Sequence, residues 1–128
     1  MKTIKQTYHI HAPIDEVWNA LVDPRIIEKW GGGPAVMDDK EGTSFELWGG
    51  EMYGKNIKVV HGKKLVQEWF GGKWDKASIA TFTLKKEDGN KTRVDLVHED
   101  VPDIEAKEIE QGWKDYYLGP LKELVEKR

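Results

Sequence analysis

Cysteine is absent from the 128-residue sequence. This absence excludes a disulfide framework, a thiol nucleophile and a zinc site with cysteine ligands. Long apolar runs are also missing, and the first residues lead directly into an alternating pattern rather than into a signal peptide or a membrane span. We therefore expect a cytoplasmic protein that does not associate with membranes.

An excess of positive charge is missing as well. The net charge is −3, and lysines are interleaved with acidic residues along the chain. Proteins that bind nucleic acids usually carry a basic patch or stripe, so this composition argues against a nucleic-acid partner. The length is sufficient for a hydrophobic core without disulfides or metal, and we interpret residues 1–128 as one domain.

Motifs for catalysis and cofactor binding are absent too. The glycine clusters do not match the spacing of dinucleotide-binding or phosphate-binding loops, so we expect no cofactor. Acid–base catalysis needs a carboxylate or histidine held in a cavity, whereas the carboxylates on the predicted strands alternate with apolar residues and should point outward. These carboxylates are Glu46, Glu51, Glu68, Asp95 and Glu99. We therefore expect no catalytic residues.

The sequence does contain six tryptophans, a high number for a small polar protein. Side chains this large and apolar line a core, a cavity or a binding surface. Three of them lie on apolar faces of predicted elements and are interpreted as core: Trp18, Trp69 and Trp113. The other three lie at the ends of elements or beside glycines, and are candidates for a pocket mouth or a partner surface: Trp30, Trp48 and Trp74.

The first hundred residues predict a strand, two short helices and an antiparallel meander. Alternation over residues 3–11 predicts a half-buried strand. Of the two helices that follow, the second has Asp23 as its predicted N-cap and Pro24 at its first position. Alternation and turn residues then predict strands at 35–37, 43–48, 52–60, 64–70, 78–86 and 92–99.

Residues 103–128 predict one long helix at the C-terminus. Asp103 is its predicted N-cap, and Gly119-Pro120 predicts a kink or a boundary because proline lacks the backbone N–H. The order of elements predicts an α+β fold, in which a curved antiparallel sheet of about six to seven strands wraps around this helix. The apolar stripe of the helix runs through Ile109, Trp113, Tyr116, Tyr117, Leu121 and Leu124.

Four groups of short motifs occur in order along nearly the whole chain. They are Ala-Pro at 12–13 with Asp-Pro at 23–24, Gly-Thr-Ser-Phe at 42–45, Ala-Thr-Phe-Thr-Leu at 80–84, and Gln-Gly-Trp-Lys-Asp-Tyr-Tyr at 111–117. In these motifs the chain resembles the activator of heat-shock-protein-90 ATPase homologue domain. The resemblance implies the helix-grip fold, which that family shares with START lipid-transfer domains and polyketide cyclases.

The resemblance also implies a function. We expect non-catalytic binding of a small apolar ligand in a hydrophobic cavity between the sheet and the C-terminal helix. One alternative is a stress-related module that assists a heat-shock chaperone through exposed tryptophans, and another is a cyclase-like or hydrolase-like enzyme. The candidate ligand-binding residues, in the cavity or at its mouth, are Trp30, Phe45, Leu47, Trp48, Tyr53, Gln67, Trp69, Trp74, Phe82, Trp113, Tyr116 and Tyr117.

The histidines raise the question of a metal site. His9 and His11 share one face of the first strand, and His98 approaches them if the first and last strands pair. Three imidazoles can bind zinc, but the spacing has no HxxxH or HExxH character. We therefore expect histidines that face solvent, and no bound metal.

Overall fold

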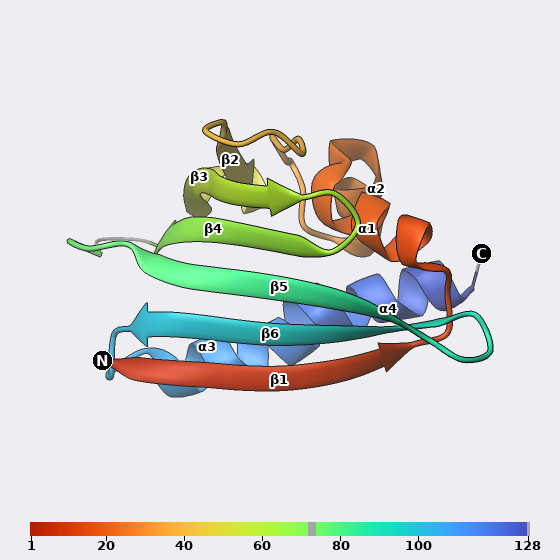
Figure 1. Ribbon diagram of the computed structural model, residues 1–128. Coiled ribbons are helices and arrows are strands. Elements are labelled where there is room, and N and C mark those ends of the chain that lie inside the picture. The colour runs from red at the N-terminus through yellow and green to blue at the C-terminus, as the bar shows by residue number, and fades with distance from the viewer. Residues whose placement is uncertain (72–73, 128) are drawn as a thin grey trace.

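The computed structural model describes residues 1–71 and 74–127 (Figure 1). Residues 72, 73 and 128 lie outside the described part, and residue 128 is the last residue of the predicted C-terminal helix. No helix within the described residues is long and apolar enough to cross a membrane. The elements are β1 (Lys2–Ile10), α1 (Ile14–Val22), α2 (Pro24–Trp30), β2 (Ser44–Leu47), η1 (Trp48–Gly50), β3 (Met52–Val60), β4 (Lys64–Gly71), β5 (Ser78–Glu87), β6 (Lys91–Val101), α3 (Ala106–Gly112), η2 (Trp113–Tyr117) and α4 (Leu118–Glu126).

Within these residues, six strands form one antiparallel sheet in the order β1-β6-β5-β4-β3-β2. The helices α3 and α4 lie across one face of the sheet, with α1 and α2 near one end of it (Figure 1). Along β4 and β6, every second side chain is buried against these helices, which is the alternation that a half-buried sheet requires. The predicted helix-grip architecture is therefore confirmed.

The predicted strand at 35–37 is absent. Only Val36 pairs there, in an isolated antiparallel bridge with Glu46. The chain then leaves the sheet, because the carboxylate of Asp38 accepts hydrogen bonds from the backbone N–H of Lys40 (2.9 Å) and the hydroxyl of Thr43 (2.5 Å). Local side-chain bonds of this kind compete with a strand ladder. The sheet therefore has the lower of the two predicted strand numbers.

The helix α2 begins where the sequence predicts. Asp23 is its N-cap and accepts a hydrogen bond from the backbone N–H of Arg25 (2.9 Å), with Pro24 in the first turn. Its last residue, Trp30, is buried, and the indole N–H donates to the carbonyl of Ala20 in α1 (2.8 Å). Trp30 therefore joins the two short helices. The sequence made it a candidate for a pocket mouth or a partner surface, but its side chain is buried between these helices instead.

The C-terminal helix begins later than predicted. Its N-cap is Glu105, so the prediction of Asp103 is wrong. The carboxylate of Asp103 instead pairs with the N-terminal amine at 2.8 Å. This ion pair holds the start of β1 beside the end of β6, and the salt-bridged carboxylate is therefore not free to cap the helix.

The same helix is also interrupted. Residues Trp113–Tyr117 form a π-helical turn, in which the N–H of Leu118 donates to the carbonyl of Trp113, five residues earlier. Tyr117 leaves helical geometry (φ −123°, ψ −86°), and α4 starts anew at Leu118. A boundary was predicted at Gly119-Pro120, two residues later. The difference arises because proline is tolerated in the first turn of a helix, where its missing N–H would have no partner.

The π-helical turn also shifts the buried stripe. After the extra residue in the turn, the buried positions of α4 are Leu118, Leu121 and Val125. Leu121 was predicted to be buried, whereas Val125 takes the place predicted for Leu124. As a result Tyr116, which was predicted to be part of the stripe, is 66% exposed. Leu124 is only partly buried.

Two glycines on either side of the turn provide a test of this geometry. A Cβ atom at Gly119 would lie 1.9 Å from the backbone carbonyl oxygen of Lys114, whereas a Cβ at Gly112 would meet nothing closer than 3.9 Å. Gly119→Ala should therefore lower the free energy of unfolding by roughly 1–3 kcal/mol. Gly112→Ala should raise it by up to about 1 kcal/mol, because alanine is the better helix former.

Urea unfolding of both variants measures these effects. The comparison is matched because each change adds one methyl group to a helical glycine of the same segment. Equal stabilisation by the two substitutions would contradict the close backbone approach at the π-helical turn.

Candidate functional site

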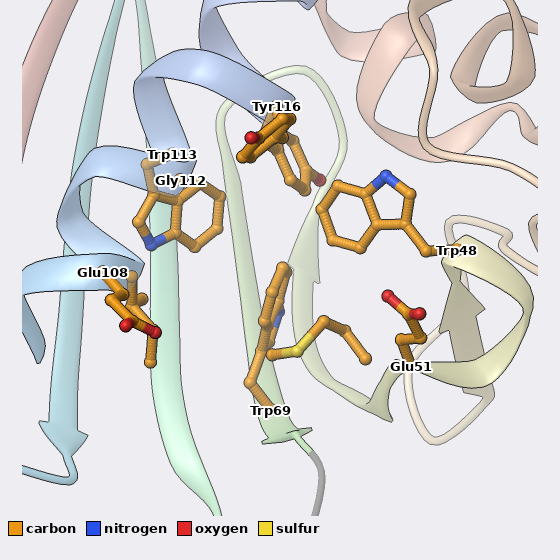
Figure 2. A pocket seen from close by; sticks show the side chains of 10 residues that line it. Trp48, Glu51, Trp69, Glu108, Gly112, Trp113 and Tyr116 are labelled. Carbon is orange, nitrogen blue, oxygen red and sulfur yellow. The ribbon is translucent and has the colours of Figure 1, made fainter. Parts of the chain in front are cut away.

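A pocket of about 510 Å³ opens between the C-terminal helical segment and the part of the sheet formed by β3 and β4 (Figure 2). Concave, mostly apolar sites of roughly 300–1,000 Å³ are typical of small-molecule binding. The pocket is lined by Trp48, Glu51, Met52, Trp69, Glu108, Ile109, Gly112, Trp113, Tyr116 and Tyr117.

The π-helical turn places three aromatic side chains around this pocket. Trp113 and Tyr117 are four residues apart and are both buried against the sheet, whereas Tyr116 is exposed at the rim. π-Helical turns are rare and often occur at functional sites, because they redirect side chains that a regular helix would place elsewhere. Here the turn forms one wall of the pocket.

The floor of the pocket is a cluster of aromatic rings. The ring of Trp113 lies 4.9 Å from that of Trp69 and 4.7 Å from that of Tyr117, measured between centroids. Behind Tyr117, the rings of Trp30 and Phe82 follow at 4.5 Å and 5.8 Å. Tilted and stacked contacts at these separations are favourable for aromatic pairs, so the floor is well packed rather than hollow.

Trp48 forms the opposite wall. It has a positive φ of 51°, an uncommon conformation for a bulky residue. Two hydrogen bonds to the glycine loop after α2 hold it there: its backbone N–H donates to the carbonyl of Gly32 (2.8 Å), and its indole N–H donates to that of Gly31 (2.9 Å). Backbone strain of this kind is frequent at binding sites, where the surroundings hold one side chain in place.

A buried polar chain fixes the orientation of Trp69. Its indole N–H donates to the side-chain carbonyl of Gln67 (2.8 Å), and the amide of Gln67 donates in turn to the side chain of Asn56 (2.8 Å). Gln67 and Asn56 are fully buried and lie outside the lining of the pocket. Gln67 therefore supports the floor of the pocket from behind.

Trp113 is held by His98, a residue predicted from the sequence to face solvent. His98 is fully buried: the indole N–H of Trp113 donates to its Nδ1 (3.1 Å), and its Nε2 lies 2.7 Å from the hydroxyl of Ser78. An acceptor at Nδ1 requires a neutral ring with its proton on Nε2. Burial favours this neutral form and lowers the pKa of His98 to about 4.

Of the other two histidines of the predicted group, His9 lies on the opposite face of the sheet and His11 follows the end of β1. His9 and His11 are exposed, and His9 contacts the carboxylate of Glu87 (2.9 Å). Within residues 1–71 and 74–127, no three side chains of histidine or acidic residues are arranged to hold a metal ion. The three histidines therefore do not come together.

Tyr117 contributes a polar atom to an otherwise apolar region. Its hydroxyl is buried and has no hydrogen-bond partner within the described part of the chain. Burial raises the pKa of this hydroxyl, so it stays protonated and remains able to donate a hydrogen bond. Leaving such a buried group unpaired costs about 1–3 kcal/mol.

The pocket brings together five of the twelve residues predicted from the sequence to bind a ligand. Three of the others, Phe45, Leu47 and Phe82, are buried in the core beneath or beside the floor. The five that line the pocket are Trp48, Trp69, Trp113, Tyr116 and Tyr117. A role in ligand binding stays a prediction for both groups of residues.

Tyr53 and Trp74 lie away from the pocket. Tyr53 is 41% exposed and its ring stacks on that of Phe70, its cross-strand partner, on the outer face of the sheet. Trp74 is half-buried, and its indole N–H donates to the carboxylate of Glu105 at the start of α3. Neither residue is among those that line the pocket.

Five residues of the lining were not among those predicted from the sequence. Three of them, Glu108, Ile109 and Gly112, lie on α3, where the spacing places them beside Trp113 and Tyr116. Helical spacing could therefore have identified them. The other two, Glu51 and Met52, follow the short turn η1, whose geometry has no clear sequence signal.

Comparison with known proteins agrees with this architecture. The family model described as Activator of Hsp90 ATPase homolog 1-like protein matches residues 11–126. An uncharacterised protein of Schizosaccharomyces pombe is 29% identical over 121 residues, which cover 93% of this chain and 36% of that protein. The human Activator of 90 kDa heat shock protein ATPase homolog 1 is 25% identical over 122 residues, which cover 94% of this chain and 36% of the human protein.

The chain thus spans about a third of the length of the curated relatives that it matches. Among solved structures, an HSP90 activator from Plasmodium falciparum superimposes with a TM-score of 0.89 at 20% identity, over 98% of this chain and 96% of that chain. Similarity at this identity shows the fold alone. The family model covers almost the whole chain, and the chain therefore belongs to the family of Activator of Hsp90 ATPase homolog 1-like proteins.

Proposed function

We propose that this protein binds a small apolar molecule in the aromatic pocket and does not catalyse its conversion. The observation that carries the proposal is the pocket itself, which is about 510 Å³ in volume and is lined mainly by aromatic and aliphatic side chains. Apolar pockets with a few polar groups are the usual form of a small-molecule site. We place this binding in the cytoplasm, as expected from the sequence.

The rigidity of the walls supports this proposal. Trp48 is held by two hydrogen bonds to backbone carbonyls, Trp69 by Gln67, and Trp113 by His98. A binding site whose side chains are already fixed loses little conformational entropy when a ligand binds. The three tryptophans of the pocket are therefore pre-organised.

The positions of the titratable groups support the non-catalytic part of the proposal. The most strongly buried histidine, His98, lies behind Trp113, outside the lining, and both of its ring nitrogens have hydrogen-bond partners. The two carboxylates of the lining, Glu51 and Glu108, are exposed at the rim. Neither arrangement resembles a general acid or base held in a cavity.

The proposal predicts that binding depends on Trp48 and not on an equally large aromatic residue elsewhere. Trp48→Ala should weaken binding of the neutral probe 1-naphthalenemethanol by about tenfold or more, since the variant loses one wall of the pocket. Isothermal titration calorimetry measures the dissociation constant. The control is Tyr53→Ala, which removes an exposed aromatic ring from the outer face of the sheet and should leave binding unchanged. Equal binding by both variants would place the probe outside the pocket.

The alternative function is contact with a heat-shock chaperone. Two observations favour it: relatives of this chain are named as activators of the 90 kDa heat shock protein ATPase, and Tyr116 at the pocket rim is 66% exposed. An aromatic side chain this exposed beside an apolar opening is a suitable anchor for a protein partner. This alternative predicts that the protein is empty when isolated from its host.

A further inference from the structure

The lining of the pocket carries charge of one sign only. Of its ten residues, Glu51 and Glu108 are acidic and none is basic. They come from separate parts of the chain, since Glu51 lies between η1 and β3 and Glu108 lies on α3. Figure 2 shows them on opposite sides of the pocket, with Trp69 between them in this view. The opening is therefore flanked by two negative charges.

Neither carboxylate forms an ion pair with another residue that the structure describes. Both are exposed, so they remain able to contact a molecule that enters the pocket. Their carboxylates would repel an anionic ligand and attract a cationic one. Charge complementarity therefore favours a cationic ligand over an anionic one.

The aromatic walls act in the same direction. The electron-rich faces of tryptophan and tyrosine rings attract ammonium and guanidinium groups, and tryptophan does so most strongly. Three such residues that line the pocket are Trp48, Trp113 and Tyr116, and Tyr116 is exposed at the rim. A positive group at the opening would therefore lie close to aromatic rings and in the electrostatic field of the two carboxylates.

We infer that the natural ligand is an organic cation with an apolar body, an amine or guanidinium compound whose charged group lies between Glu51 and Glu108. This inference rests on the proposed function, because it assigns the charge of the molecule bound in the same pocket. The apolar body lies against the aromatic floor, and the charged end stays near water, where its desolvation costs little.

Three probes with one ring system and different charges test the inference. They are 1-naphthylmethylamine, which is cationic at pH 7, neutral 1-naphthalenemethanol and anionic 1-naphthoate. Calorimetry should show the amine binding about tenfold more tightly than the alcohol, and the carboxylate binding most weakly. High salt should reduce the difference between amine and alcohol, because the rim carboxylates are exposed to solvent.

The double variant Glu51→Gln/Glu108→Gln locates the effect. It should lose most of the preference for the amine, measured as the ratio of the dissociation constants for the alcohol and the amine. The matched control is Glu123→Gln, which removes one charge from an exposed position on α4, outside the lining, and should retain the preference.

The outcomes separate this inference from the proposed function. Equal affinity for amine and alcohol, or a preference that persists in the double variant, overturns the inference and leaves pocket binding intact. Failure of all three probes to bind overturns the proposed function, and the inference with it.

Discussion

Trp113→Ala is expected to lower the free energy of unfolding by roughly 3–5 kcal/mol, the range found when large aromatic residues are removed from protein cores. Trp113 is buried and contacts the rings of Trp69, Phe82 and Tyr117. The substitution creates a cavity between the helical segment and the sheet. It also removes the donor to Nδ1 of His98 and so leaves a buried acceptor unpaired.

Urea denaturation followed by circular dichroism measures this loss. The matched control is Tyr116→Ala, which removes an aromatic ring from the same π-helical turn, but from a position that is 66% exposed. The control should change stability by about 0.5 kcal/mol or less. A loss below about 1 kcal/mol for Trp113→Ala would mean that this face of the segment does not pack on the sheet.

Acid is expected to destabilise the protein through His98. Burial lowers the pKa of this histidine from 6.5 to about 4 in the folded state. Between these two pH values the unfolded chain binds a proton at this residue and the folded chain does not, so stability falls as the pH falls. The loss in the free energy of unfolding from this one residue is roughly 3 kcal/mol at pH 4 and below, and there is no loss above about pH 7.

Protonation would also put a second proton on the ring of His98, at the nitrogen that accepts from Trp113. The variant His98→Asn separates this effect from other acid effects, because asparagine offers an acceptor but does not titrate. Its stability at neutral pH should be lower, whereas its loss of stability between pH 6.5 and 4 should be smaller than in the unmodified protein. If the free energy of unfolding falls equally with pH in the two proteins, His98 does not cause the loss of stability between pH 6.5 and 4.

Much of the fold follows from patterns that a sequence displays directly. Alternation in β1 placed Ile4 and Ile10 inward and His9 outward, and the structure confirms this. The N-cap Asp23 was equally clear, since a capping residue and Pro24 occur together. These signals are local, so neighbouring residues are sufficient to interpret them.

The π-helical turn could not be predicted in this way. Proline at 120 indicated an irregular helix, but whether the chain bends at Gly119 or restarts at Leu118 depends on packing against the sheet. The one-residue shift then determined that Tyr116 is exposed and Val125 is buried. A regular helical period contains no information about this shift.

His98 is a different case, because the signal was present. It continues the alternation of Val94 and Leu96 in β6, and all three are buried. A polar residue at an inward position of a strand is easily predicted to face solvent when its hydrogen-bond partners are unknown. Those partners, Ser78 on β5 and Trp113 on the π-helical turn, become neighbours only in the folded chain.

The central claim is that the pocket holds an apolar small molecule. Native mass spectrometry of the protein purified from its own host tests this most directly, followed by denaturing extraction and identification of what is released. We predict a stoichiometric adduct that is absent from the Trp48→Ala variant. An unmodified protein that is isolated with an empty pocket would contradict the claim and favour the chaperone contact.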